Sequence, residues 1–285
     1  MMRLIVDSGS TKTDWICLND EGNLVFETQT LGLNPQVLDE HIIEERIINN
    51  YDLYQNRKNI SHLFFYGAGC GTEPPKKLIK KVFESIFVKA NIDVKEDTYA
   101  AVYSAASKGE KSIVSIIGTG SNCTYFDGEN IHQKITSLGY VLMDDASGNY
   151  FGRQLIRDYF FNKMPSDILK KFSTSFDLDP NLVKDKLYKK PNPNTYLATF
   201  AKFVVENKNN LYCSELIKKG FNLFITNQIE QFPDCKEIPL HFIGSISFYL
   251  KDELDECLKN RGMILGNVLK KPIEGLVNYH LKYSS

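Results

Sequence analysis

The sequence predicts an α/β protein of two domains, and three observations lead to this prediction. The chain has 285 residues, which is long for one hydrophobic core but suits two medium-sized domains. Short apolar runs alternate with longer stretches of helical periodicity, a pattern typical of mixed α/β architecture. A segment near residue 5 also reappears near residue 116, so the two domains are expected to begin in the same way.

The first domain is expected to open with an antiparallel meander of three strands. Apolar runs at 3–6, 15–18 and 24–27 are separated by a polar turn at 7–13 and by the turn Asn19-Asp20-Glu21-Gly22. Strands and helices then alternate. The further predicted elements are a helix at 35–48, a buried strand at 63–66 ending in Gly67-Ala68-Gly69, a helix from Pro74 to about 90, a strand at 92–94 and a helix at 97–106.

The internal repeat is the most informative feature of the chain. Residues 5–13, Ile-Val-Asp-Ser-Gly-Ser-Thr-Lys-Thr, are echoed at 116–124 by Ile-Ile-Gly-Thr-Gly-Ser-Asn-Cys-Thr. Each copy is an apolar strand, a turn of small residues and a second strand, closed by Asp-Glu-Gly at 20–22 or Asp-Gly-Glu at 127–129. The charged, glycine-containing stretch 107–111 precedes the second copy, so we predict domains at 1–108 and 109–285.

The second domain is expected to be mostly helical after its opening hairpin. Helical patterns dominate from Asn149 to Gln231, and a late strand at 240–243 ends at Gly244-Ser245. A terminal helix is predicted at about 273–283, after Pro272, and it has the option of packing back on the first domain.

Composition excludes several classes of function. The 34 basic and 35 acidic residues leave a net charge of −1, so no basic field is expected for nucleic acid or an anionic membrane. No signal-peptide core or membrane-spanning stretch is evident, and a cytoplasmic location is expected. The six cysteines are scattered without a close pair, which argues against zinc, an iron–sulfur cluster or a disulfide framework.

The two small-residue turns are candidate phosphate sites, because consecutive backbone N–H groups in such turns form an anion-binding concavity. One turn of this kind more often only reverses the chain. Two related turns in two related domains favour a site for the two ends of a triphosphate.

These turns resemble known motifs. Asp7-Ser8-Gly9-Ser10-Thr11 is similar to the first phosphate motif of the actin, hexokinase and heat-shock ATPase superfamily. Gly118-Thr119-Gly120-Ser121 resembles the second phosphate motif, and Gly244-Ser245 resembles the adenosine motif. Blocks 118–123 and 142–148 are similar to those of the N-acetylglucosamine kinase and BadF/BadG-type ATPase family. The resemblance spans Arg3 to about Tyr279 and implies two ribonuclease-H-like (actin-like ATPase) domains with ATP and sugar in the cleft between them.

The resemblance also implies site residues, with ATP and Mg²⁺ as cofactors. Asp97 matches the family's catalytic base, although an Asp at a helix start is commonly an N-cap, and Glu96 is the competing carboxylate. Asp7 would orient metal-bound water, and Lys12 would either contact phosphate or remain a solvated lysine. The implied nucleotide- and phosphate-binding residues are Asp7, Gly9, Ser10, Thr11, Lys12, Gly118, Thr119, Gly120, Gly244 and Ser245.

The resemblance also implies a sugar site, which matches the family's sequence pattern less closely than the phosphate motifs do. Its residues are Asn34, Asp97, Ser121, Asn122, Ser137, Leu138, Gly139 and Asp144. Asn34 is otherwise an ordinary loop residue before a proline, and Asp144 is otherwise a turn-forming Asp. Met143, Asp145 and Ala146 replace the family's Gly, Glu and Gly, and Leu138 stands where animal enzymes carry Trp, so the sugar loop is altered.

The expected function is ATP-dependent phosphorylation of an amino sugar, either N-acetylglucosamine or N-acetylmuramic acid. The expected partner is this small molecule, with no nucleic acid and no membrane, and homodimerisation stays open. One alternative is a BadF-type activator ATPase, which needs cysteines at a subunit contact for its cluster. A second is a non-catalytic actin-like sensor of sugar or nucleotide.

Overall fold

The computed structural model describes residues 2–9 and 12–283 and divides the chain into two compact units. Unit 1 comprises Met1–Ser104 and Lys271–Ser285, and unit 2 comprises Ala105–Lys270. The division therefore falls slightly before the predicted boundary at 108. It also assigns the last segment of the chain to unit 1, in line with the stated option that the terminal helix packs back on the first domain, although the predicted second domain ran to residue 285.

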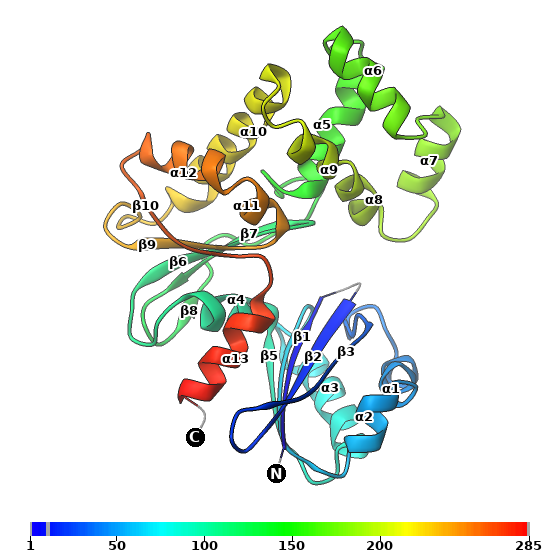
Figure 1. The fold of residues 1–285 in the computed structure, drawn as a ribbon, viewed down its shortest axis with the longest axis vertical. Coiled ribbons are helices and arrows are strands. Elements are labelled where there is room, and N and C mark those ends of the chain that lie inside the picture. Colours follow the sequence, from blue (N-terminus) through cyan, green and yellow to red (C-terminus); the bar gives the residue numbers. More distant parts are fainter. Residues whose placement is uncertain (1, 10–11, 284–285) are drawn as a thin grey trace. The chain divides into compact units, whose positions relative to one another are not determined.

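Unit 1 is built on a five-stranded sheet in its described residues (Figure 1). The strands are β1 (Met2–Ser8), β2 (Lys12–Asn19), β3 (Leu24–Leu31), β4 (Ile60–Gly67) and β5 (Asn91–Glu96), in the order β3-β2-β1-β4-β5. The first three pair antiparallel, as the sequence predicted, whereas β1-β4 and β4-β5 pair parallel. The carboxyl ends of β1, β4 and β5 therefore share one edge of the sheet.

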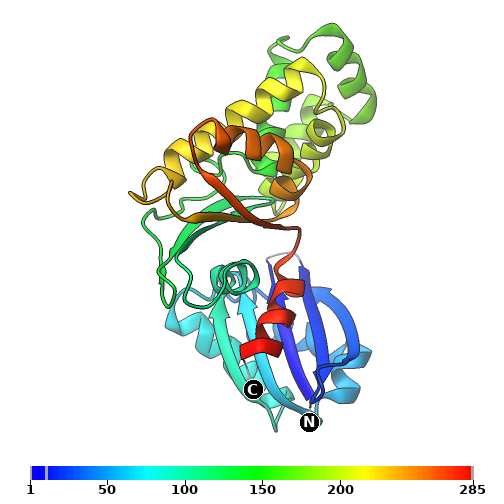
Figure 2. The same ribbon diagram turned by 60° about the vertical axis from the view of Figure 1, so that its left-hand side comes forward.

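Helices cover both faces of this sheet. The helices of unit 1 are α1 (Glu40–Ile48), α2 (Tyr51–Asn56), α3 (Glu73–Ile86), α4 (Asp97–Ala105) and α13 (Pro272–Tyr283). On one face, α1 and α3 bury Ile43, Val82 and Phe83 against Leu4 and Trp15 of the sheet. On the other face, α4 and α13 pack on the sheet through a second core, and Figures 1 and 2 show α13 in red beside the blue strands.

Unit 2 repeats the strand order of unit 1, which confirms that the two domains begin alike. Its strands are β6 (Ser112–Ile117), β7 (Ser121–Phe126), β8 (Ile131–His132), β9 (Pro239–Ile243) and β10 (Ile264–Leu269). Counted from β8, the order is β8-β7-β6-β9-β10. The first three pair antiparallel and the last two parallel, strand for strand as in unit 1.

Helices form most of the rest of unit 2, as predicted for 149–231. They are α5 (Gly148–Phe160), α6 (Ser166–Ser175), α7 (Pro180–Tyr188), α8 (Pro193–Thr199), α9 (Ala201–Glu206), α10 (Leu211–Phe224), the π-helical turn η1 (Ile225–Ile229), α11 (Ser245–Tyr249) and α12 (Lys251–Lys259). One large core joins them to the sheet, with Phe151, Phe221 and Phe242 fully buried. Helices α10 and α12 pack side by side in yellow and orange (Figure 2).

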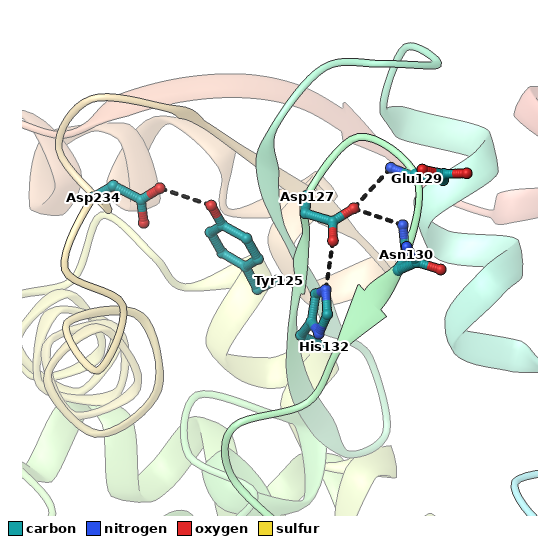
Figure 3. Close-up of polar contacts among 6 residues, drawn as sticks. All are labelled: Tyr125, Asp127, Glu129, Asn130, His132 and Asp234. Atoms are coloured by element: carbon teal, nitrogen blue, oxygen red, sulfur yellow. Dashed lines mark hydrogen bonds and ion pairs between the residues drawn. The ribbon is translucent and has the colours of Figure 1, made fainter.

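The two hairpins of the repeat are closed by the same kind of turn. In unit 1 the Asn19 side chain accepts hydrogen bonds from the amides of Glu21 and Asn23, at 3.0 and 2.8 Å. In unit 2 the Asp127 carboxylate accepts from the amides of Glu129 and Asn130, at 2.9 and 2.7 Å, and pairs with His132 (Figure 3). These amides lower the pKa of Asp127 to about 2, and the side-chain hydrogen bond with His132 acts in the same direction.

Some predicted boundaries were wrong. The helix expected at 35–48 begins only at Glu40, because residues 35–37 form a turn around Asn34. Strands β8 and β10 were not predicted. In β10 the pairing register shifts between Leu265 and Val268, so the strand lacks the regular alternation by which strands are identified.

Candidate functional site

The site in unit 1 lies at the shared carboxyl edge of the parallel strands. Asp7 is the penultimate residue of β1, and Asp97 is the first residue of α4, directly after β5. Both side chains are half-buried, and each belongs to the same end of the sheet. The structure therefore brings together the predicted metal-orienting residue and the predicted base.

Burial and like charge alter the acidity of both carboxyls. The pKa of Asp7 is raised to about 7, mainly by burial and also by the Asp97 and Asp14 carboxylates, against the effect of Lys12 and Lys271. Burial also raises the pKa of Asp97 to about 6, with Glu96 acting in the same direction. A carboxylate with a pKa just below neutrality is well matched to accepting a proton at pH 7.

The loop that carries Asn34 is tied to the end of β1. The Leu33 amide donates to Ser8 Oγ at 3.0 Å, and Ser8 Oγ also shares a 2.8 Å hydrogen bond with Thr13 Oγ1. Asn34 Oδ1 accepts from the Gln36 amide at 2.9 Å, and the Gln36 side chain donates to the Gly69 carbonyl at 3.2 Å. Three loops therefore meet beside Asp7, and the sequence had left Ser8 without a role of its own.

A lysine pair borders the same turn. Lys12 Nζ lies 2.8 Å from the Asp14 carboxylate, so it is ion-paired and is not a freely solvated lysine. Lys271 Nζ reaches the other oxygen of Asp14 at 3.8 Å from the start of α13. No local pattern pointed to Lys271, because the last segment of the chain was assigned to the other domain. Gly9 is exposed beside this pair, while Ser10 and Thr11 lie outside the described residues.

In unit 2, the turn Gly118-Thr119-Gly120 rests on the first turn of α5. The amides of Gly148 and Asn149 donate to the carbonyls of Gly118 and Thr119, at 2.7 and 3.0 Å. Because N–H and C=O point in opposite directions across a trans peptide, the amides of Thr119 and Gly120 are turned away from α5. This orientation leaves two adjacent donors for an anion, as a phosphate turn requires.

The Gly244-Ser245 turn lies directly against this phosphate turn. Gly244 has a φ of +124°, and a Cβ there would come within 2.3 Å of the Ile117 carbonyl oxygen. Only glycine therefore allows the end of β9 to pack on the end of β6. The structure thus joins the predicted second phosphate motif and the predicted adenosine motif, with Ser245 opening α11.

Asp144 is a third predicted site residue of unit 2 that lies beside the phosphate turn. Its side chain is buried, with 7% exposure, and burial raises its pKa while hydrogen bonds from Asn149 and the Ser121 amide lower it. A Cβ on Gly120 would lie 2.6 Å from Asp144 Oδ2, so the carboxylate stands directly against the phosphate turn. Ser121 Oγ, at the start of β7, donates to the Asp145 carbonyl at 2.7 Å and so links the segment that carries Asp144 to β7.

The altered residues of the sugar loop have defined contacts. Asp145 accepts from Asn227 Nδ2 in η1 at 2.8 Å, and Ala146 adopts a left-handed φ of 57°. Met143 Sδ lies 3.3 Å from the Leu138 amide, so its long side chain folds onto the loop 137–139.

The remaining predicted sugar residues are less enclosed. Ser137 and Leu138 are exposed, whereas Gly139 and Asn122 are half-buried. Asn122 Oδ1 accepts from Gln133 Nε2 at 3.1 Å. These positions are open to a ligand, but fewer contacts fix them than fix Asp144.

Metal-binding groups are sparse in the described residues. They contain no group of three or more His, Cys, Asp or Glu side chains that could hold a metal ion. Mg²⁺ usually takes one or two carboxylates together with substrate phosphates, and Asp7 at the carboxyl end of β1 would supply one such carboxylate. All six cysteines are buried. Within residues 2–9 and 12–283, no helix is long and apolar enough to cross a membrane.

Comparison with known proteins was made for the whole chain. A model described as the BadF/BadG/BcrA/BcrD ATPase family matches residues 6–259. The fold resembles a proposed N-acetylglucosamine kinase from Porphyromonas gingivalis, with a TM-score of 0.91, 32% identity and 99% coverage of both chains.

More distant structures share the fold. A proposed N-acetylglucosamine kinase from Chromobacterium violaceum has a TM-score of 0.74 and 14% identity over 98% of both chains. A ROK family glucokinase from Streptomyces griseus, in complex with glucose and AMPPNP, has a TM-score of 0.57 and 13% identity over 97% of both chains. No curated protein matched the sequence.

Proposed function

Because the chain belongs to the BadF/BadG/BcrA/BcrD ATPase family, we propose that it is an ATP-dependent kinase of an amino sugar, N-acetylglucosamine or the related N-acetylmuramic acid. Membership of an ATPase family implies the use of ATP. The choice of sugar is supported by the similarity to the Porphyromonas gingivalis protein, at 32% identity over nearly the full length of both chains.

The observation that carries the proposal is the placement of Asp97. Its carboxyl has a pKa of about 6, and it stands at the same strand edge as Asp7 and the Asn34 loop. An acceptor hydroxyl held by Asn34 would give its proton to Asp97 while its oxygen attacks the γ-phosphorus, and ADP would leave. The amides of Thr119 and Gly120 would hold phosphate oxygens in this reaction.

Asp7 would hold Mg²⁺ through water. The ion, when bound, neutralises charge on the β- and γ-phosphates. Burial and the Asp97 carboxylate raise the pKa of Asp7, and a nearby cation would stabilise its charged form against them.

The two alternatives have weaker support. A BadF-type activator needs cysteine thiolates at a subunit surface, but burial raises the pKa of Cys70 and Cys123 to about 12, and all six thiols are buried. A non-catalytic sensor has no need of a carboxyl tuned near neutrality at Asp97.

The test is ADP release with a panel of N-acetylglucosamine, N-acetylmuramic acid, glucosamine and glucose. We expect the N-acetylated sugars to stimulate ADP release well above the rate with ATP alone, with a phosphorylated sugar as product. ATP turnover that no sugar stimulates would contradict the proposal.

A further inference from the structure

Asn149 links the phosphate turn of unit 2 to Asp144. The side chain is fully buried in the first turn of α5. Its Nδ2 donates to the Thr119 carbonyl at 2.7 Å and to Asp144 Oδ2 at 2.8 Å, while its backbone amide donates to the same Thr119 carbonyl at 3.0 Å. One amide group therefore fastens the turn and the carboxylate to each other.

The orientation of this amide is determined by its partners. Both neighbours of Nδ2 are acceptors, so the NH₂ group must face them and Oδ1 must face the other way. Oδ1 is buried and has no hydrogen-bond partner among the described residues. A buried acceptor without a partner is unfavourable, so the Oδ1 end of this side chain does not contribute to stability.

Asn149 is not required to cap α5. Ser147 is the N-cap residue, and its Oγ accepts from the Tyr150 amide at 3.2 Å and donates to the Asp144 carbonyl at 2.7 Å. The side chain of Asn149 therefore serves the turn and the carboxylate and not the helix end.

Resting on the proposed function, we propose that Asn149 is a positioning residue that fixes the Asp144 carboxylate and the Gly118–Gly120 turn as one unit. In this role it acts through Asp144 on the sugar and through Thr119 on the nucleotide, and it touches neither ligand. Asp144 Oδ2 is occupied by Asn149, so hydroxyls of the sugar would be held by the remaining acceptor capacity of Asp144.

The proposal has a consequence for protonation, because Asn149 donates to the ionised form of Asp144. Burial raises the pKa of Asp144, and Asp145 raises it further. Asn149, the Ser121 amide and Arg153 lower it, in that order of strength. Removal of the Asn149 donors would therefore raise the pKa of Asp144, and the carboxylate would lose its charge at a higher pH.

Two substitutions are expected to have opposite pH dependence. Asn149→Leu removes the donor to Asp144 and the donor to Thr119, so sugar affinity should be below the wild-type value at every pH and should fall more steeply than in the wild type on the acidic side. Asn149→Asp places a second carboxyl against Asp144, and one shared proton restores the link only at low pH. Its affinity should therefore fall as the pH rises. If one variant fails to fold, the other still tests the proposal.

The experiment is calorimetric titration with N-acetylglucosamine, and separately with Mg²⁺ and AMPPNP, from pH 5.5 to 9. Near pH 6, Asn149→Leu should lower the affinity for N-acetylglucosamine roughly tenfold or more, as expected for the loss of a charge-assisted hydrogen bond. The affinity for AMPPNP should fall several-fold. The matched control is Tyr150→Phe at the next residue, which removes a buried hydroxyl that has no hydrogen-bond partner among the described residues and should leave both affinities unchanged.

Parallel pH profiles for wild type and both variants would overturn the positioning role, since a purely structural defect is not rescued by pH. If the wild-type protein binds AMPPNP but no sugar, the proposed function is wrong. The nucleotide titrations of the variants then still decide the role of Asn149 at the turn.

Discussion

At the scale of residues, the candidate sites of both units are built on carboxyl groups whose pKa values are raised by their surroundings. Asp7, Asp97 and Asp144 all have raised pKa values with burial as the main cause. The sequence indicated these three residues through motif resemblance. It could not indicate Ser8 or Asn149 as supports, because their roles depend on hydrogen bonds to residues distant along the chain, such as Leu33 and Thr119.

The first prediction concerns Asp97→Asn. This change should leave AMPPNP affinity near the wild-type value but lower sugar-dependent ADP release by about a hundredfold or more, because the base is lost. In the wild-type protein kcat/KM should fall as the pH drops through about 6, since Asp97 accepts a proton only when ionised. Steady-state kinetics over pH 5 to 9 measures both effects.

Glu96→Gln is the matched variant for this experiment. The Glu96 charge raises the pKa of Asp97, so its removal should shift the acidic limb of kcat/KM to lower pH without abolishing turnover. If Glu96→Gln abolishes turnover and Asp97→Asn does not, Glu96 is the base.

The second prediction compares two glycines of the phosphate turn. Gly120→Val places a side chain against Asp144 Oδ2, so both folding stability and nucleotide binding should suffer. Gly118→Ala adds a Cβ that meets no atom within 4 Å, so the protein should fold with an unchanged melting temperature. Its added methyl group would nevertheless occupy space that a phosphate needs. We expect at least roughly tenfold weaker AMPPNP binding by titration, as for a lost charge-assisted hydrogen bond. Wild-type affinity in Gly118→Ala would mean that this turn is only a hairpin.

At the scale of elements, the sequence predicted those that have regular periodicity or a strong end signal. Helix α4 was predicted with nearly its observed bounds, and the meander β1-β2-β3 was predicted in the right order but with shorter strands than the structure has. Strand β10 was not predicted, because Gly266 and Asn267 interrupt its pattern where a buried histidine of β9 approaches. The Asn267 amide donates to His241 Nδ1 at 2.8 Å. Such an interruption depends on the neighbouring strand and leaves no periodic signal in the local sequence.

The third prediction concerns α13, which a buried histidine holds on the sheet of unit 1. His280 Nε2 lies 2.9 Å from the Tyr66 hydroxyl, and the ring stacks on Phe64 at 4.0 Å. Burial lowers the pKa of His280 to about 4, with Lys95 acting in the same direction, so the folded state holds the ring neutral. The unfolded chain binds a proton below about pH 6.5. Stability should therefore be full above pH 6.5 and decline as the pH falls toward 4.

Urea unfolding at pH 7.5, 6 and 5 measures this effect. The contribution of His280 to the free energy of unfolding should fall by up to about 1.4 kcal/mol per pH unit below 6.5. His280→Leu should be less stable at pH 7.5, because Tyr66 loses its partner, but its stability should depend less on pH. An equally steep pH dependence in the variant would assign the effect to other groups.

At the scale of the whole molecule, the proposed reaction divides its residues between two units that share one topology. Unit 1 supplies Asp7, Asn34 and Asp97, whereas unit 2 supplies the Gly118–Gly120 turn, Asp144 and Gly244. Each unit has its own sheet and its own cores. The echo of residues 5–13 at 116–124 was enough to predict this duplication, because each copy is an apolar strand, a turn of small residues and a second strand.

The last prediction is that one sugar molecule stabilises both units together. If Asn34 and Asp144 hold the same ligand, N-acetylglucosamine at a hundred times its Kd should slow hydrogen exchange in peptides of both units, by a free energy of up to about 2.7 kcal/mol. Hydrogen exchange with mass spectrometry resolves the two sets of peptides. Asn34→Ala should then remove protection in unit 2 as well as in unit 1, and Asp144→Asn should do the same in unit 1. AMPPNP protection of the β6–β7 turn should survive in Asn34→Ala, because Asn34 is not among the phosphate-binding residues. If each variant loses protection only in the unit that carries its substitution, the two sets of residues do not share a ligand.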